Sequence, residues 1–209
     1  MLAATAPHAL PKNPPSLAEK LQQDKRKPPD NGPTTATMNT ALRAGLAAAW
    51  PICLGYFPIG LALGVLAQQA GLPWWAMTAM SVLVFAGSSQ FICVAMLATG
   101  ASLPAIVLTT LMVNLRHALM SSSLAVHLRG VDRRFLALFA YGITDESFAV
   151  NMARFRAGHW NRWSALITNQ LPNLCWISAT TIGVLVGQTI PPGALGIDYA
   201  LSAMFLCLL

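Results

Sequence analysis

The chain has 209 residues and a formal charge of +6, and 55% of its residues are hydrophobic while only 10% are charged. Soluble domains average roughly 25% charged residues, so this composition excludes an ordinary water-exposed surface and indicates a membrane-embedded protein. The positive charge does not indicate nucleic-acid binding, because every lysine falls within the first 27 residues and most arginines lie between apolar segments.

Residues 1–40 are rich in Pro, Lys, Asn and Thr and contain no apolar run. Such a stretch cannot bury enough apolar surface to fold, so it is predicted to be a disordered tail. It also lacks the apolar region of a signal peptide. Residues 41–209 are predicted to form one transmembrane domain.

Six apolar segments follow, and each is expected to be helical because an open strand cannot satisfy its backbone in lipid. They cover residues 45–67, 74–98, 103–126, 134–153, 164–187 and 198–209. The predicted fold class is therefore all-α, a bundle of several membrane helices. The last segment is too short to cross a bilayer core about 30 Å thick, so we expect a C-terminally incomplete version of a longer protein.

Three segments are predicted to contain helix breaks. The first has Pro51 and Pro58, the second has Gly-Ser-Ser-Gln at residues 87–90, and the fifth has Asn-Gln-Leu-Pro-Asn at residues 169–173. Breaks at membrane depth are tolerated where they line a cavity or are buried in protein. The breaks are therefore expected to meet around a shared cavity.

A faint internal repeat accompanies these breaks, since the stretch that follows Gly64 resembles the stretch that follows Gly183. Paired interrupted segments in two halves of a chain are typical of transporters built from structural repeats. The fold is therefore predicted to contain a structural repeat.

The segment at 134–153 either crosses the membrane or dips in and returns, since Asp145 and Glu146 lie near its centre. If the segment turns back within the membrane, the basic loops at 129–134 and 154–162 lie on the same side of the membrane. With three full spans before it, however, both loops face away from a cytoplasmic N-terminus, contrary to the positive-inside rule. Arg43 and the lysine-bearing tail nevertheless favour a cytoplasmic N-terminus, which is the predicted orientation.

The short polar stretch inside the second apolar segment, here called the polar notch, has two interpretations. It consists of Gly87, Ser88, Ser89 and Gln90. Small residues allow helices to cross closely. Alternatively, a half-helix that begins at Gly87 would direct free N–H groups at an anionic group such as a carboxylate. In the second case the notch and the neighbouring Phe91 form part of a substrate site.

Two further polar clusters lie in apolar surroundings. Asn114 and His117 share a helix face while Arg116 points elsewhere, an arrangement that fits either interhelical hydrogen bonds or a functional role. Carboxylates at membrane depth, Asp145 and Glu146, fit a proton relay, a counter-ion to Arg116, or the first turn of a helix capped by Thr144.

No enzymatic activity is predicted, because the HExxH, GxSxG and P-loop patterns are all absent. The four cysteines lie in apolar segments without CxxC spacing, so neither a disulfide framework nor a metal site is expected. No cofactor is expected either. An intramembrane enzyme that uses His117 and a carboxylate is the weakest alternative.

Four ordered motifs, GYFPIGLALGVLA, FAGSSQF, VNLRHALMSSSL and GITDESFAV, resemble those of the AzlC family. The resemblance extends from about Leu42 to Leu209 and implies a multi-pass exporter of the bacterial inner membrane. It also implies substrates such as valine, leucine, isoleucine and methionine, and a small membrane partner of the AzlD type. The long tail and the early end of the chain depart from the family pattern.

The resemblance and the polar clusters together predict the site. The substrate-binding residues are expected to be Pro58, Gly60, Gly87, Ser88, Ser89, Gln90, Phe91 and Asn114. Charge relay or coupling is expected from Arg116, His117, Asp145 and Glu146. Apolar residues such as Phe57, Phe85 and Phe91 are expected to hold the substrate side chain. The alternative function is a membrane scaffold that does not transport, in which these groups only join helices.

Overall fold

The computed structural model describes residues 35–158, 160–189, 199 and 206. The first 34 residues of the predicted tail and most of the sixth apolar segment lie outside the described residues. Residues from Thr37 onward form one compact unit, which is described here by itself. Its helices are α2 (Thr35–Gln69), α3 (Trp74–Leu83), α4 (Gly87–Ala98), α5 (Leu103–Ala125), the 3₁₀ turn η1 (Val126–Leu128), α6 (Arg133–Tyr141), α7 (Asp145–Arg156) and α8 (Arg162–Gly187).

The all-α prediction is confirmed for the described part of the chain, which contains no strand. Two helices, Met38–Gln69 and Leu103–Leu128, are long and apolar enough to cross a membrane, and α3 and α4 are shorter apolar helices. With 26 residues, α8 is also long enough, at a rise of 1.5 Å per residue, to cross a core about 30 Å thick.

Two of the predicted helix breaks are wrong. The helix α2 is continuous through Pro51 and Pro58, and α8 is continuous through Pro172. Proline removes one hydrogen bond, but neighbouring groups in a membrane bundle can satisfy the freed carbonyl without ending the helix. The third predicted break is present, since α3 and α4 are separated by residues 84–86 just before Gly87. A further break, in the fourth apolar segment, separates α6 and α7 at residues 142–144.

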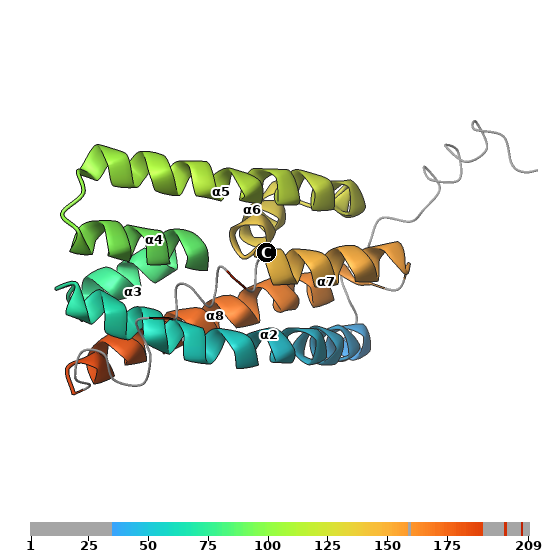
Figure 1. The fold of residues 1–209 in the computed structure, drawn as a ribbon. Helices are drawn as coiled ribbons and strands as arrows, with labels where there is room; N and C mark the ends of the chain where they lie inside the picture. The colour runs from blue at the N-terminus through green and yellow to red at the C-terminus, as the bar shows by residue number, and fades with distance from the viewer. Residues whose placement is uncertain (1–34, 159, 190–198, 200–205, 207–209) are drawn as a thin grey trace, which may run out of the picture. The chain divides into compact units, whose positions relative to one another are not determined.

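Each of these two breaks turns the chain back on itself, so that α3–α4 and α6–α7 form helical hairpins (Figure 1). The tips of the two hairpins approach each other in the middle of the unit from opposite ends. Only α2, α5 and α8 extend across the unit. Of the two alternatives for segment 134–153, the structure shows the one in which the chain turns back, whereas the expected crossing by segment 74–98 is replaced by a second turn back.

Two of the continuous helices, α2 and α8, pack in parallel along their length (Figure 1). The side chain of Ser164 donates to the carbonyl of Ala41 near their beginnings, and Gly187 lies against Gln68 near their ends. Midway, a Cβ on Gly64 would lie 2.7 Å from Cα of Gly183, and a Cβ on Gly183 would lie 3.0 Å from Cα of Gly64. Only glycine permits this approach.

The two glycines of this contact also begin the predicted repeat. Most of the second copy lies beyond residue 189, outside the described residues. The helices that carry the beginnings of the two copies are nevertheless neighbours, with the reciprocal glycine contact at equivalent positions. The structural repeat itself stays a prediction.

Side chains from other helices satisfy the carbonyls at the broken helix ends. The amides of Asn169 and Gln170 on α8 donate to the carbonyls of Phe139 and Leu138, in the last turn of α6. The hydroxyl of Tyr141 donates to the carbonyl of Val82, in the last turn of α3. The last four carbonyls of a helix lack partners within it, so these contacts stabilise the breaks.

Candidate functional site

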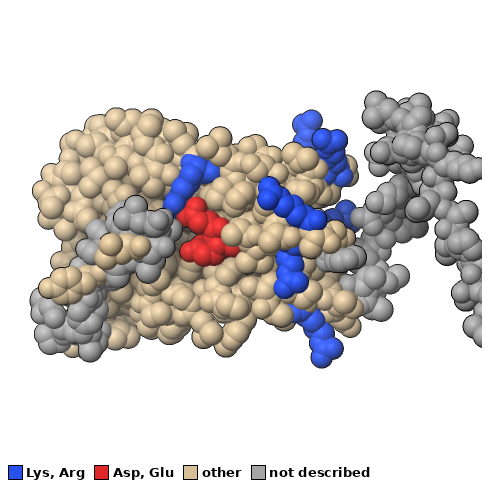
Figure 2. All heavy atoms as spheres, turned by 45° about the vertical axis from the view of Figure 1, so that its right-hand side comes forward, with Lys and Arg blue, Asp and Glu red and all other residues tan. Residues whose placement is uncertain are grey.

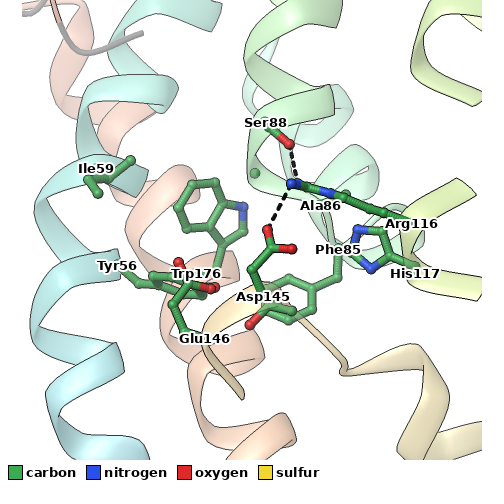
Figure 3. A pocket seen from close by; sticks show the side chains of 12 residues that line it. Tyr56, Ile59, Phe85, Ala86, Ser88, Arg116, His117, Asp145, Glu146 and Trp176 are labelled. Carbon is green, nitrogen blue, oxygen red and sulfur yellow. Dashed lines mark hydrogen bonds and ion pairs between the residues drawn. The ribbon is translucent and has the colours of Figure 1, made fainter. Parts of the chain in front are cut away.

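The tips of the two hairpins and three long helices enclose a pocket of about 60 Å³ (Figure 3). A buried water needs about 10–15 Å³ by this measure, so the pocket in this state holds a few waters or a small ligand group. Its wall combines charged, polar and aromatic side chains. The lining residues are Tyr56, Ile59, Phe85, Ala86, Gly87, Ser88, Arg116, His117, Thr144, Asp145, Glu146 and Trp176.

The first wall of the pocket is the N-terminus of α4, which begins at Gly87 as predicted. No side chain caps this end, and its first turn carries no acidic residue. The first backbone N–H to bond along the helix is that of Gln90, which donates to the carbonyl of Ala86 at 3.0 Å. The preceding N–H groups and the positive end of the helix dipole favour an anion here.

The N-terminus of α7 lines the same pocket but has the opposite character. Thr144 caps it, and the side chain of Ser147 accepts from the backbone N–H of Thr144 in a reciprocal capping box. Asp145 and Glu146 occupy the first turn, which agrees with the capped-helix alternative. The α4 end is therefore open to an anion, whereas the α7 end presents carboxylates.

Arg116 joins the two hairpin tips. Its Nη1 lies 2.8 Å from Oδ2 of Asp145, and its Nη2 donates to Oγ of Ser88. The two charged side chains of the ion pair are about one third exposed, at 33% and 36%. The Nε of Arg116 is buried without a partner among the described residues. The guanidinium thus contacts both tips and keeps one donor unused.

The second carboxylate, Glu146, accepts a hydrogen bond from the hydroxyl of Tyr56 on α2. His117 lies beside Arg116 on α5 and uses Nδ1 to contact the carbonyl of Ile143, in the α6–α7 turn. The pocket wall therefore contains two carboxylates and one guanidinium. Figure 2 shows the acidic side chains gathered in the middle of one face beside a basic one, while the other basic side chains gather towards one end.

Apolar side chains form the rest of the wall. Phe85 precedes the α4 tip, Ile59 comes from α2 and Trp176 from α8. The ring of Tyr56 stands edge-on to that of Trp176, with centroids 5.3 Å apart. The pocket therefore has charged groups of both signs next to an apolar surface.

The structure places six of the twelve predicted site residues in the pocket wall: Gly87, Ser88, Arg116, His117, Asp145 and Glu146. The other six do not line it. Ser89, Gln90 and Phe91 are buried behind the α4 tip. Pro58 is exposed and Gly60 packs on Ala179 of α8, while Oδ1 of Asn114 is buried without a partner among the described residues.

Five lining residues were absent from the predicted site: Tyr56, Ile59, Ala86, Thr144 and Trp176. Tyr56 and Ile59 lie close to Pro58 in the motif GYFPIG, so this motif could have indicated them as site residues. Trp176 stands in an apolar run that offered no such signal. Of the phenylalanines expected to hold a side chain, Phe85 lines the pocket, whereas Phe57 is exposed and Phe91 belongs to the core.

Among the described residues, no group of three or more His, Cys, Asp and Glu side chains is placed to hold a metal ion. The pocket wall offers hydrogen-bonding groups, charged groups and apolar contact. Its wall carries groups that match the negative group, the positive group and the apolar part of a small zwitterionic molecule, and in this state the space between them holds only a few waters or a small ligand group.

Comparison with known proteins identifies the family of the chain. A family profile described as AzlC protein matches residues 51–190. The chain belongs to the AzlC family. The resemblance predicted from the four sequence motifs is thus confirmed, and this member of the AzlC family is a membrane protein.

Relatives of this AzlC-family chain come from bacteria and archaea. It is 30% identical over 179 residues to inner membrane protein YgaZ of Escherichia coli (strain K12), which covers 82% of the chain and 71% of YgaZ. An uncharacterized membrane protein of Archaeoglobus fulgidus is 33% identical over 176 residues, which covers 80% and 74%.

The branched-chain amino acid transport protein AzlC of Bacillus subtilis (strain 168) is 29% identical over 167 residues, which covers 79% of the chain and 65% of that protein. The chain thus spans between 65% and 74% of the length of these three relatives. No solved structure matches it.

Proposed function

We propose that this chain exports branched-chain and related hydrophobic amino acids, namely valine, leucine, isoleucine and methionine, across the bacterial inner membrane. The observation that carries the proposal is the pocket, in which an open helix N-terminus, a guanidinium and two carboxylates lie beside an apolar wall. A hydrophobic amino acid has the matching parts. The name of the Bacillus subtilis relative supports the same substrate class.

In the proposed complex, the substrate carboxylate binds the N–H groups at the beginning of α4 and the guanidinium of Arg116. The substrate ammonium binds Asp145, with Glu146 close by on the same helix turn. The side chain then lies against Ile59, Phe85 and Trp176 in a pocket that widens as the Arg116–Asp145 pair separates, since the space of about 60 Å³ in this state is too small for a whole amino acid. Charge-assisted hydrogen bonds of this kind are short and strong, and they fix the orientation of the ligand.

The Arg116–Asp145 ion pair is the arrangement of the empty site in this proposal. An amino acid can replace both halves of the pair, since its carboxylate takes the guanidinium while its ammonium takes the carboxylate. A ligand with one charge can replace only one half. It would leave the other charge partly buried without a partner, which is costly. The pair therefore selects for zwitterions.

We propose that a proton accompanies transport, because the wall holds one carboxylate more than it holds guanidinium groups. An intramembrane carboxylate with a hydroxyl partner, such as Glu146 with Tyr56, fits a proton pathway. Export by proteoliposomes is expected to slow when an ionophore collapses the pH gradient. An unchanged rate after that treatment would exclude proton coupling.

We also propose that the chain works with a small membrane subunit of the AzlD type, as the family resemblance implies. The apolar window of α5 has only 6% of its residues buried within the structure, so most of this helix is left for lipid or a partner. Tagged chain and the product of an adjacent small-subunit gene are expected to purify together. Export by the chain alone at the full rate would contradict the need for a partner.

The exporter proposal is tested by feeding cells dipeptides that contain valine, leucine or methionine. Cells that produce the chain with its small subunit are expected to accumulate less of the free amino acid inside and more outside than cells without them. Asp145→Ala should remove the difference at equal protein level. Equal intracellular accumulation of the free amino acid with and without the chain would contradict the exporter function and favour the scaffold alternative.

A further inference from the structure

Trp176 occupies a special place in the pocket wall. Its side chain is only 2% exposed, and it reaches from α8 to the tip of the α3–α4 hairpin. A Cβ added to Gly87 would lie 3.0 Å from Cη2 and 3.2 Å from Cζ2 of its indole. The indole therefore lies directly against the first residue of α4, with Tyr56 on another side.

A series of hydrogen bonds between buried side chains holds this indole on the side away from the pocket. Its Nε1 donates to Oε1 of Gln90 at 2.7 Å, and Nε2 of Gln90 donates to Oγ of Ser81 at 3.4 Å. The hydroxyl of Ser81 pairs with that of Thr180 at 2.9 Å. Thr180 lies one helical turn after Trp176, so this series of hydrogen bonds leads from α8 to α4, on to α3 and back to α8.

The supporting residues are separate from the pocket. Gln90, Ser81 and Thr180 are 0–1% exposed, and none of them lines the pocket wall. In a low-dielectric interior an unpaired polar group is costly, so rotation of the indole is opposed because it would leave both its own Nε1 and the buried Oε1 of Gln90 without a partner. Trp176 is thus a rigid part of the wall, whereas an apolar side chain without such bonds could change rotamer.

We infer that Trp176 is the specificity-determining residue of the site, and that Gln90 is the positioning residue that holds it. The rigid indole limits how large a substrate side chain fits between the α4 tip and Tyr56. This inference rests on the proposed function, because it concerns the apolar end of the same site. It also gives Gln90 a role different from the substrate contact predicted from the sequence.

Three substitutions test the inference in different directions. Trp176→Phe removes part of the wall and should raise the ratio of kcat/KM for phenylalanine to that for valine by about tenfold, the scale on which one or two carbon atoms change discrimination in an apolar pocket. Gln90→Met keeps the volume, removes the bond to Nε1 and should raise the same ratio by a smaller factor. Gly87→Ala adds a methyl group against the indole and should lower the ratio.

Trp163→Phe is the matched control, because Trp163 lies on the same helix but packs with Phe135 in the other core cluster. It should leave the ratio unchanged. Competition of valine, leucine, methionine and phenylalanine for export is measured for each variant that is recovered in the membrane. A merely structural role of Gln90 would lower all rates by the same factor.

The outcomes separate this inference from the proposed function. If the unmodified chain with its small subunit exports none of these amino acids, the proposed function fails and the inference falls with it. If export is observed but none of the recovered variants changes the phenylalanine-to-valine ratio, the inference is overturned and the proposed function stands. Opposite shifts in Trp176→Phe and Gly87→Ala support it.

Discussion

The guanidinium of Arg116 contacts two partners that belong to different hairpins, Ser88 at the α4 tip and Asp145 at the α7 tip. The planar guanidinium meets them with two separate nitrogens in fixed geometry, whereas a lysine would have to reach both from one nitrogen. Arg116→Lys is therefore expected to lower kcat/KM for leucine export by about tenfold or more, since a hydrogen bond to a charged group contributes about 1.5–3 kcal/mol.

Export kinetics check this expectation at matched protein levels. The control is Arg129→Lys, because Arg129 is exposed, follows the end of α5 and η1, and does not line the pocket. Equal kcat/KM in Arg116→Lys and the control would contradict the bridging role.

The Arg116–Asp145 pair also bears on stability. Asp145→Asn leaves the guanidinium without its counter-charge. Because both side chains are about one third exposed, we expect a loss of about 1–2 kcal/mol, below the 3–5 kcal/mol of a fully buried pair. Adding Arg116→Gln should restore most of the stability but none of the export. Thermal denaturation in detergent checks this, and a double variant less stable than Asp145→Asn would argue against a balanced pair.

At the scale of helices, the parallel contact of α2 and α8 depends on glycine. A Cβ on Gly64 would lie 2.3 Å from the carbonyl oxygen of Thr180, which is backbone and cannot rotate away. Gly64→Ala should therefore lower the melting temperature, through a loss of about 1–3 kcal/mol from overpacking. Gly55→Ala on the same helix is the control, because a Cβ there meets nothing within 4 Å. Equal melting temperatures of the two variants would contradict the close contact.

The helix breaks illustrate what the sequence can predict. The break before Gly87 and the helix start at Asp145 follow from local chemistry, small residues in one case and a capping threonine in the other. The predicted breaks at Pro58 and in residues 169–173 failed for a different reason. The amides of Asn169 and Gln170 bond the end of α6 instead of their own backbone, and a sequence does not reveal which helix a side chain serves.

The site shows the same limit. Charged and small polar residues at membrane depth are conspicuous, so Arg116, Asp145 and Ser88 could be predicted as members of one site. Trp176 could not, because an aromatic residue that lines a pocket and one that fills a core have the same sequence signal. Gln90 was assigned to the substrate for its polarity, whereas its burial and its bond to Trp176 are visible only in three dimensions.

At the scale of the whole unit, the two hairpins remove the conflict over orientation. Because segment 74–98 turns back as well as segment 134–153, only α2 and α5 cross before the first basic loop (Figure 1). The loops at 129–134 and 154–162 therefore lie at the end of the unit where α2 begins. This agrees with the gathering of basic side chains towards one end in Figure 2.

The positive-inside rule then predicts that this end faces the cytoplasm. In a variant without native cysteines, a single cysteine placed at Ala101, between α4 and α5, should react with a membrane-impermeant maleimide added to whole cells. A cysteine at Val131, between η1 and α6, should react only after the cells are opened. Labelling in the reverse order would contradict the predicted orientation.

The central claim is that the pocket binds a molecule with both charges and an apolar side chain. The most direct measurement is the melting temperature of the purified chain with leucine, with leucinamide, which keeps the positive group, and with 4-methyl-2-oxopentanoate, which keeps the negative group. Ligands that bind the folded state raise the melting temperature with concentration. We predict a rise with leucine alone, lost in the Arg116→Gln/Asp145→Asn variant. No rise with leucine, or an equal rise with either analogue, would contradict the account.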